Sequence, residues 1–230
     1  MRHILTAGIL ALFCQGSPFV TFCHASTVDH LVPLEENYGL LLKYEQLSRE
    51  KLLVTTGEIA RFISLPGSAS VETSVSVYQV RGKTGSLPGD YWVTVTQSSK
   101  SLWEAMQSDS KPEAVRVERL DAPLPAAVAQ TVHDTWVRML MRVKRAPKSE
   151  GVAVDSTQEI FSASKSDGST IQGQSSSESG AKTKELIGIA FSLIEYCDAP
   201  VVKRSEIANK IGKTASKLLA RVTSSSGREK

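Results

Sequence analysis

The chain has 230 residues, a net charge of +3 at pH 7 and a hydrophobic fraction of 41%, which is enough for one sizeable core or two small ones. It holds only 3 cysteines and 4 histidines. These counts argue against a disulfide-held scaffold and against a catalytic zinc site that draws on several histidines.

The first predicted element is a cleavable export signal over residues 1–25. A short positive start precedes an apolar run over Ile4–Phe13, and Ala25 supplies a small residue just before Ser26. An uncleaved membrane anchor is the rival interpretation, but polar and turn residues at 15–18 interrupt the run before it reaches the roughly 20 residues of a membrane span. We therefore expect cleavage near Ala25–Ser26 and export to the periplasm or the extracellular space.

Cleavage at this bond would leave Cys197 as the only cysteine, so the exported chain could form no intramolecular disulfide. Two histidines would remain, His30 and His133, far apart in the sequence and outside any HExxH or CxxC spacing. The sequence predicts no metal and no other cofactor. The domain is expected to be held together by its apolar core.

A short helix is predicted over residues 34–47 from the helical spacings of its leucines and Tyr38. Short apolar runs at 52–54 and 59–63, around Gly57, begin a β-rich stretch. Residues 71–78 then alternate between valine or threonine and other side chains, which is typical of a half-buried strand.

A second alternating strand is predicted over 91–96, and the turn-rich segment 82–89 between the two strands suggests a hairpin. A short helix over 99–106, capped by Ser99 or Ser101, is expected to follow. A further strand is then predicted over 114–120.

The Pro-containing segment 121–125 is expected to break that strand and to open the clearest helix of the chain. An apolar stripe at steps of three and four defines this helix, and Pro147 lies beyond its end. The stripe consists of Leu124, Val128, Val132, Trp136, Met139 and Val143.

Strands over 152–164 and 169–174 are predicted to form a second hairpin across the turn at 166–168. A serine-rich connector over 174–180 leads to residues 184–197, which are apolar on most faces of a helix and predict a central core helix.

The last helix is predicted over residues 205–222, within a basic amphipathic segment that ends in a polar tail and spans 201–230. An ordinary amphipathic helix would pack its apolar stripe on the domain and leave its basic residues in water. Alternatively, those residues could contact an anionic membrane surface or a partner. The candidate residues are Lys210, Lys213, Lys217 and Arg221. Nucleic acid is not expected as a partner, because it is rarely met after export.

Trp92 is the other candidate for a partner surface. Neighbouring residues of a strand point to opposite faces, so Tyr91 and Trp92 cannot both enter one core. Core packing of the indole is the alternative. The catalytic interpretation is a hydrolase that uses Cys197, paired with His133, or the carboxylates of Glu195 and Asp198. No GxSxG, SxxK, Walker or GxGxxG motif supports it.

Together these features predict an α+β fold with an antiparallel sheet of about five or more strands, packed on one face by two or three helices. A single domain is expected over residues 26–200, followed by the basic segment 201–230. The predicted function is that of an exported, non-catalytic protein that binds another protein or a component of the cell envelope. A secreted or periplasmic hydrolase is the alternative.

Overall fold

The structure is a computed structural model, which describes residues 29–34, 38–53, 57–67, 70–80, 90–108, 111–145, 157–176 and 179–224. The predicted signal over 1–25, the turn over 82–89 and the first part of the predicted strand 152–164 lie outside the described residues.

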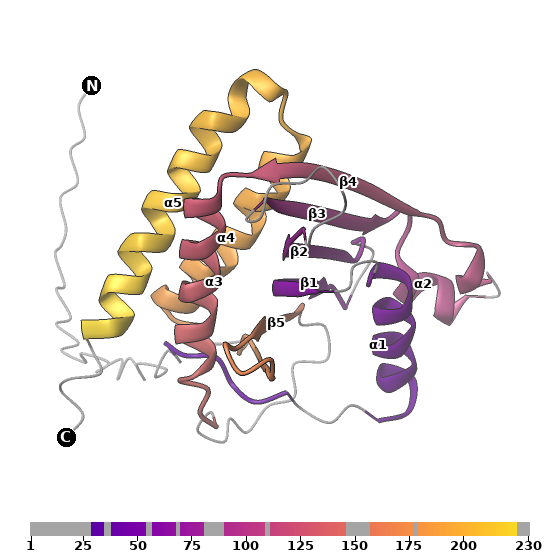
Figure 1. Cartoon of the computed structure of the whole chain (residues 1–230). Coiled ribbons are helices and arrows are strands. Elements are labelled where there is room, and N and C mark those ends of the chain that lie inside the picture. The colour runs from indigo at the N-terminus through magenta and orange to yellow at the C-terminus, as the bar shows by residue number, and fades with distance from the viewer. Residues whose placement is uncertain are drawn as a thin grey trace, which may run out of the picture.

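Six strands form one antiparallel sheet in the order β4-β3-β2-β1-β5-β6 (Figure 1), which confirms the predicted α+β class. The first four strands form a meander, and the β5–β6 hairpin adds to the free side of β1. The strands are β1 (Glu58–Leu65), β2 (Thr73–Gln79), β3 (Tyr91–Ser98), β4 (Val117–Leu124), β5 (Gln158–Ser164) and β6 (Thr170–Gln174).

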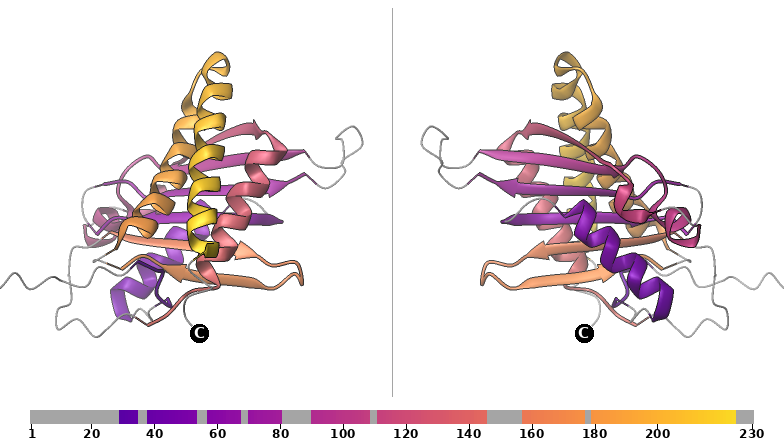
Figure 2. Two further views of the ribbon diagram at one scale, coloured as in Figure 1. Left: turned by 90° about the vertical axis from the view of Figure 1, so that its left-hand side faces the viewer. Right: turned by 90° about the vertical axis from the view of Figure 1, so that its right-hand side faces the viewer.

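Three helices lie on one face of the sheet, as predicted. They are α3 (Ala126–Leu140), α4 (Ala181–Asp198) and α5 (Val201–Ser224). The first two pack against the strands, and α5 lies across both of them as an outer layer (Figure 2). Trp136 of α3 is fully buried here, with its ring 5.9 Å from that of Phe161 on β5. The predicted apolar stripe of this helix therefore faces the sheet.

The opposite face carries two further helices, which the sequence did not place there: α1 (Gly39–Leu52) and α2 (Leu102–Gln107), followed by the 3₁₀ turn η1 (Pro112–Ala114). A second, smaller apolar cluster lies beneath them. Its buried members are Tyr44, Leu52, Ile63, Leu65, Leu102 and Ile160.

A buried carboxylate, that of Glu72, ties α1 and α2 to the sheet. The side chain of Glu72 accepts hydrogen bonds from the Tyr44 hydroxyl at 2.9 Å and from the Ser98 hydroxyl at 2.6 Å. It also accepts the backbone N–H groups of Leu102, at 2.9 Å, and Trp103, at 3.2 Å, which begin α2. Negative charge at a helix start is favourable, so the Glu72 carboxylate holds the start of α2 in place.

Two predictions from the sequence about where elements end were wrong, and the structure gives a physical reason for each. Residues 121–125 do not break the strand, because β4 continues to Leu124. The proline within it, Pro123, lies on an edge strand, where the missing N–H of proline is tolerated. The apolar run that begins at Leu52 is the end of α1 rather than a strand, and the Thr96 hydroxyl donates to its Leu52 carbonyl at 2.8 Å.

Helix α5 uses its apolar stripe inside the protein. The buried residues of the helix lie on the side that contacts α3 and α4, in the same core cluster as the sheet. They are Ala208, Ile211, Ala215, Leu218 and Val222. Among the described residues, none of the helices combines the length and the apolar character that crossing a bilayer requires.

Candidate functional site

Trp92 occupies the second position of β3, beside Tyr78 of β2 and Pro123 of β4. Its neighbour Val93 is fully buried against the core helices, so the alternation of the strand turns the indole to the other face. The indole is half-buried. Trp92 therefore lies neither in the apolar core nor fully in water.

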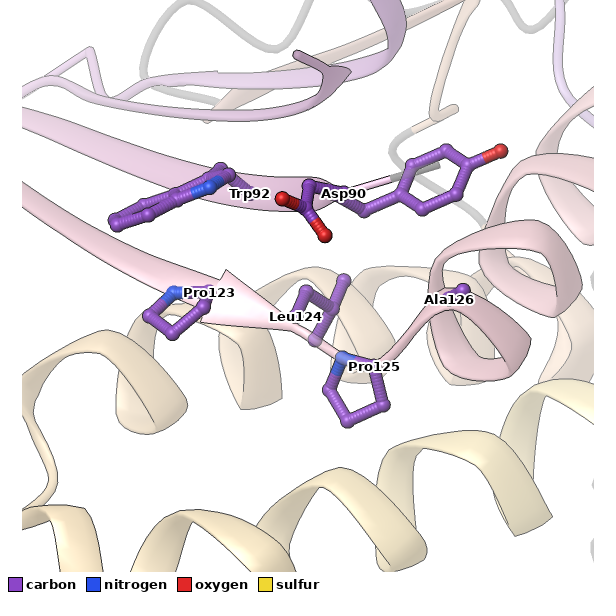
Figure 3. Close-up of a pocket in the computed structure, with 7 residues that line it drawn as sticks. Asp90, Trp92, Pro123, Leu124, Pro125 and Ala126 are labelled. Atoms are coloured by element: carbon purple, nitrogen blue, oxygen red, sulfur yellow. The ribbon is translucent and has the colours of Figure 1, made fainter. Parts of the chain in front are cut away.

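The indole forms one wall of a cleft where β3 begins, β4 ends and α3 starts, which we call the Trp92 cleft. It has a volume of about 310 Å³. Its lining residues are Asp90, Tyr91, Trp92, Pro123, Leu124, Pro125 and Ala126. Figure 3 shows the indole over Pro123 and the Asp90 carboxylate turned toward Leu124. The walls are thus mainly aromatic and proline side chains, with a single charged group.

Asp90 is exposed, and its carboxylate has no hydrogen bond or ion pair with another described residue. By contrast, the nearby Asp121 on β4 accepts a bidentate pair of bonds from Arg119 and a further bond from the Thr94 hydroxyl. Burial alone would raise the pKa of Asp121, but these hydrogen bonds outweigh burial and lower it. Asp121 is therefore already neutralised, whereas Asp90 remains available to a ligand.

The sequence did not single out Asp90 or either proline of the cleft. From the sequence, Pro123 and Pro125 predict only the end of a strand and the start of a helix. They join Trp92 because the β3–β4 register places Trp92 opposite Pro123 and Tyr91 opposite Leu124. A Pro-Leu-Pro segment at the end of an edge strand, facing a Tyr-Trp pair, is the pattern that could have indicated the site.

The predicted basic residues lie in a different place. Lys210, Lys213 and Lys217 are exposed on the outer surface of α5, while Arg221 is half-buried and forms an ion pair with Glu185 of α4. Helix α5 covers the α3–α4 side of the sheet, and the Trp92 indole belongs to the other side. The structure does not bring the two candidate surfaces together.

The side chains considered for catalysis are also separate. Cys197 is buried, its thiol contacts the Val93 carbonyl oxygen at 3.6 Å, and burial raises its pKa to about 12. The Nε2 atom of His133 lies 2.8 Å from the carbonyl oxygen of Ser164 at the end of β5. Since β3 and β5 are separated by β2 and β1, Cys197 and His133 do not form a dyad.

The carboxylates of Glu195 and Asp198 are exposed near the end of α4 and line no part of the Trp92 cleft. Across the described ranges, no group of three or more His, Cys, Asp or Glu side chains is placed to hold a metal ion.

No protein-family description matches the chain, and no curated protein and no solved structure is significantly similar to it. Its function must therefore be inferred from the geometry of the molecule itself.

Proposed function

We propose that this protein is an exported, non-catalytic protein that binds a partner protein or a component of the cell envelope through the Trp92 cleft. The observation that carries the proposal is a half-buried tryptophan in a surface cleft walled by Tyr91, Pro123 and Pro125. Tryptophan and tyrosine supply much of the energy of protein interfaces, because they offer a large rigid apolar surface with few rotatable bonds.

Export is compatible with the way the fold begins. Cleavage near Ala25–Ser26 would remove none of the described residues, the first of which is Asp29. The Asp29 carboxylate accepts the backbone N–H of Lys182 at 2.6 Å and pairs with its ammonium group at 3.0 Å, and Leu31 is fully buried. The exported chain would therefore keep every described contact of its folded form.

The hydrolase alternative gains no support from the positions of its candidate residues. A thiol with a raised pKa is a poor nucleophile at neutral pH, and Cys197 lies away from His133. The Trp92 cleft contains one carboxylate and no second acid, base or nucleophilic thiol. Recognition suits this lining better than acid–base chemistry does.

Helix α5 could not bind an anionic membrane in the way that a typical interfacial helix does. Such a helix inserts its apolar stripe into the lipid, but the stripe of α5 is packed on α3 and α4. The side chains that α5 leaves exposed are mainly polar or basic, such as Lys210 and Lys213, with Val201 and Val202 at its start. The Trp92 cleft therefore remains the better candidate surface.

Site-specific photo-crosslinking tests the proposal. A photoreactive phenylalanine analogue is placed at the exposed position 126 of the cleft, which keeps the Trp92 indole, at position 210 of α5, or at the exposed position 167 between β5 and β6 as a control. Each protein is incubated with envelope extract, and we expect an adduct from position 126 only. An adduct from position 210 alone would place the binding surface on α5, and no adduct from position 126 would refute the cleft.

Export is tested separately by mass spectrometry of the protein isolated from its native cells. We expect an N-terminus at or near Ser26 in the periplasmic or extracellular fraction. An intact Met1 in the cytosol would refute it.

A further inference from the structure

The charge and shape of the Trp92 cleft indicate what kind of group it takes. We infer that the cleft binds the cationic side chain of a lysine or arginine in a partner polypeptide. This inference rests on the proposed binding function and specifies its ligand. The juxtaposition that carries it is an available carboxylate, Asp90, beside the indole of Trp92 and above the apolar surface of Leu124 and Pro125.

A cation gains from both kinds of wall. The indole is the aromatic ring that attracts a cation most strongly over its face, and a carboxylate provides the opposite charge at the mouth of the same cleft. The aliphatic stem of a lysine or arginine side chain would lie on the proline and leucine surfaces. An anion would be repelled by the Asp90 carboxylate. A purely apolar group would displace water from that carboxylate and offer it no hydrogen bond in return.

Of the two aspartates near the cleft, Asp90 rather than Asp121 can accept an incoming cation. Arg119 is the basic residue described on β4 next to this region, and it already forms a bidentate pair with Asp121. Thr94 adds a further hydrogen bond to Asp121. Arg119 is thus already paired with Asp121, and an incoming cation does not have to displace a partner of the Asp90 carboxylate among the described residues.

The dimensions of the cleft favour one side chain of a polymer over an enclosed small molecule. At about 310 Å³, the cleft lies at the lower limit of ligand pockets, which usually bury most of a small ligand. It also opens at the sheet edge, because β4 is the end strand among the strands that the structure describes. Because Pro123 has no N–H, the end of this edge offers side-chain recognition rather than a continuous backbone ladder.

The inference is tested with the mature protein and a short fluorescent peptide that alternates Lys and Ser, followed by fluorescence anisotropy. Matched peptides carry Gln or Glu in place of Lys. We expect binding of the Lys peptide that weakens with salt, and little binding of the other two. Spermidine is added as a competitor, and we expect it to displace the peptide only at a large excess.

Two variants and two matched controls locate the binding. Asp90→Asn is expected to weaken binding of the Lys peptide about three- to tenfold, and Trp92→Ala about tenfold or more. Asp198→Asn removes an exposed carboxylate at the end of α4, and Tyr38→Ala removes an exposed aromatic ring at the start of α1; neither residue lines the cleft. Both controls are expected to bind within about twofold of the unaltered protein.

Equal binding of the Gln peptide, or unchanged binding by Asp90→Asn, would overturn the cationic ligand. Displacement by equimolar spermidine would overturn the choice of a polypeptide. The crosslinking experiment separates these failures from that of the proposed function. An adduct from position 126 to a partner segment without Lys or Arg would refute the ligand class and leave the binding role intact, whereas the absence of any adduct from position 126 would refute both.

Discussion

The two faces of the sheet are built from the same strands but are held to their helices in different ways. Toward α3 and α4 the strands present apolar side chains such as Phe62, Val75 and Val93, all fully buried. Toward α1 and α2, β1 presents Ile63 and Leu65, but β2 and β3 present small buried polar side chains. These are Ser74, Ser76, Thr94, Thr96 and Ser98.

The helices on the two faces of the sheet are therefore stabilised by different kinds of interaction. Burial of apolar area is non-directional and stabilises the α3–α4 side over its whole extent. The other side combines the smaller apolar cluster with a few directional hydrogen bonds, chiefly those to Glu72, which secure α1 and α2 near one end of the strands. The Trp92 cleft lies at the strand ends away from this anchor, where β3 begins and β4 ends. A polar, partly covered face thus leaves room for a binding site that an apolar face would close.

The largest effect is expected on the apolar side. Trp136→Ala removes a fully buried indole from between α3 and the sheet, and should lower the free energy of unfolding by about 3–5 kcal/mol. Urea denaturation followed by circular dichroism measures this loss. A loss no greater than that of Trp92→Ala, in the half-buried cleft, would contradict the dominance of the apolar face.

The next effect is expected on the polar side. Glu72→Ala removes the buried acceptor of the first N–H groups of α2 and leaves the Tyr44 hydroxyl with the Pro66 carbonyl alone, which should cost about 2–4 kcal/mol. Hydrogen exchange should rise in α1 and α2 before it rises in α3 and α4. Glu206→Ala, at an exposed position of α5, serves as the control and should change little. Equal acceleration of exchange in all four helices would show that Glu72 is not a local anchor.

A third prediction concerns how tightly the apolar side is closed. Cys197 is buried beside the Val93 carbonyl, and its pKa is raised to about 12. The folded protein should therefore react with an aromatic disulfide reagent only as fast as it opens, with little dependence on pH between about 7 and 9. Denatured protein supplies the reference rate. Rapid labelling of the folded protein would mean that α4 does not seal this face.

The smallest effect concerns Glu159 on β5, whose pKa is raised above 4.5 because burial disfavours its charged form. A raised pKa in the folded state means that the contribution of this group is most favourable below about pH 4.5 and is lost as the pH rises through the folded value. Glu159→Gln should therefore raise the melting temperature slightly at pH 7 and leave it unchanged near pH 4. Glu118→Gln, at an exposed position of β4, is the control. A gain that persists at pH 4 would rule out ionisation as its cause.

Short sequence patterns correctly predicted those helices and strands whose formation depends on neighbouring residues. The alternation of residues 91–96 identified β3, the stripe through Trp136 identified α3, and Ser101 caps α2, its hydroxyl accepting the N–H of Glu104 at 3.1 Å. The position of α1 and α2 on the second face was not predictable in this way. It depends on the bonds of Glu72 to residues 26 to 31 positions away, which no short window of sequence contains.

The candidate site was predictable only in part. The alternation at Tyr91–Trp92 indicated that one of the two aromatic side chains would leave the core, and Trp92 does so. The partners of Trp92 in the cleft could not be inferred, because the β3–β4 register that brings Pro123 beside it emerges only when the sheet is formed. The apolar stripe of α5 was found, but whether it met lipid or protein was decided by tertiary packing on α3 and α4.

The tie between Asp29 and Lys182 has a consequence for the order of assembly. It joins residues 153 positions apart, and the close approach is possible because a Cβ at Gly180 would lie 2.9–3.0 Å from Asp29 atoms. The start of the folded chain, at Asp29, is therefore held in place only after α4 has been synthesised. Such a late closure slows folding, since loop entropy must be lost before the contact forms. A polypeptide that crosses a membrane while still extended would benefit from that delay.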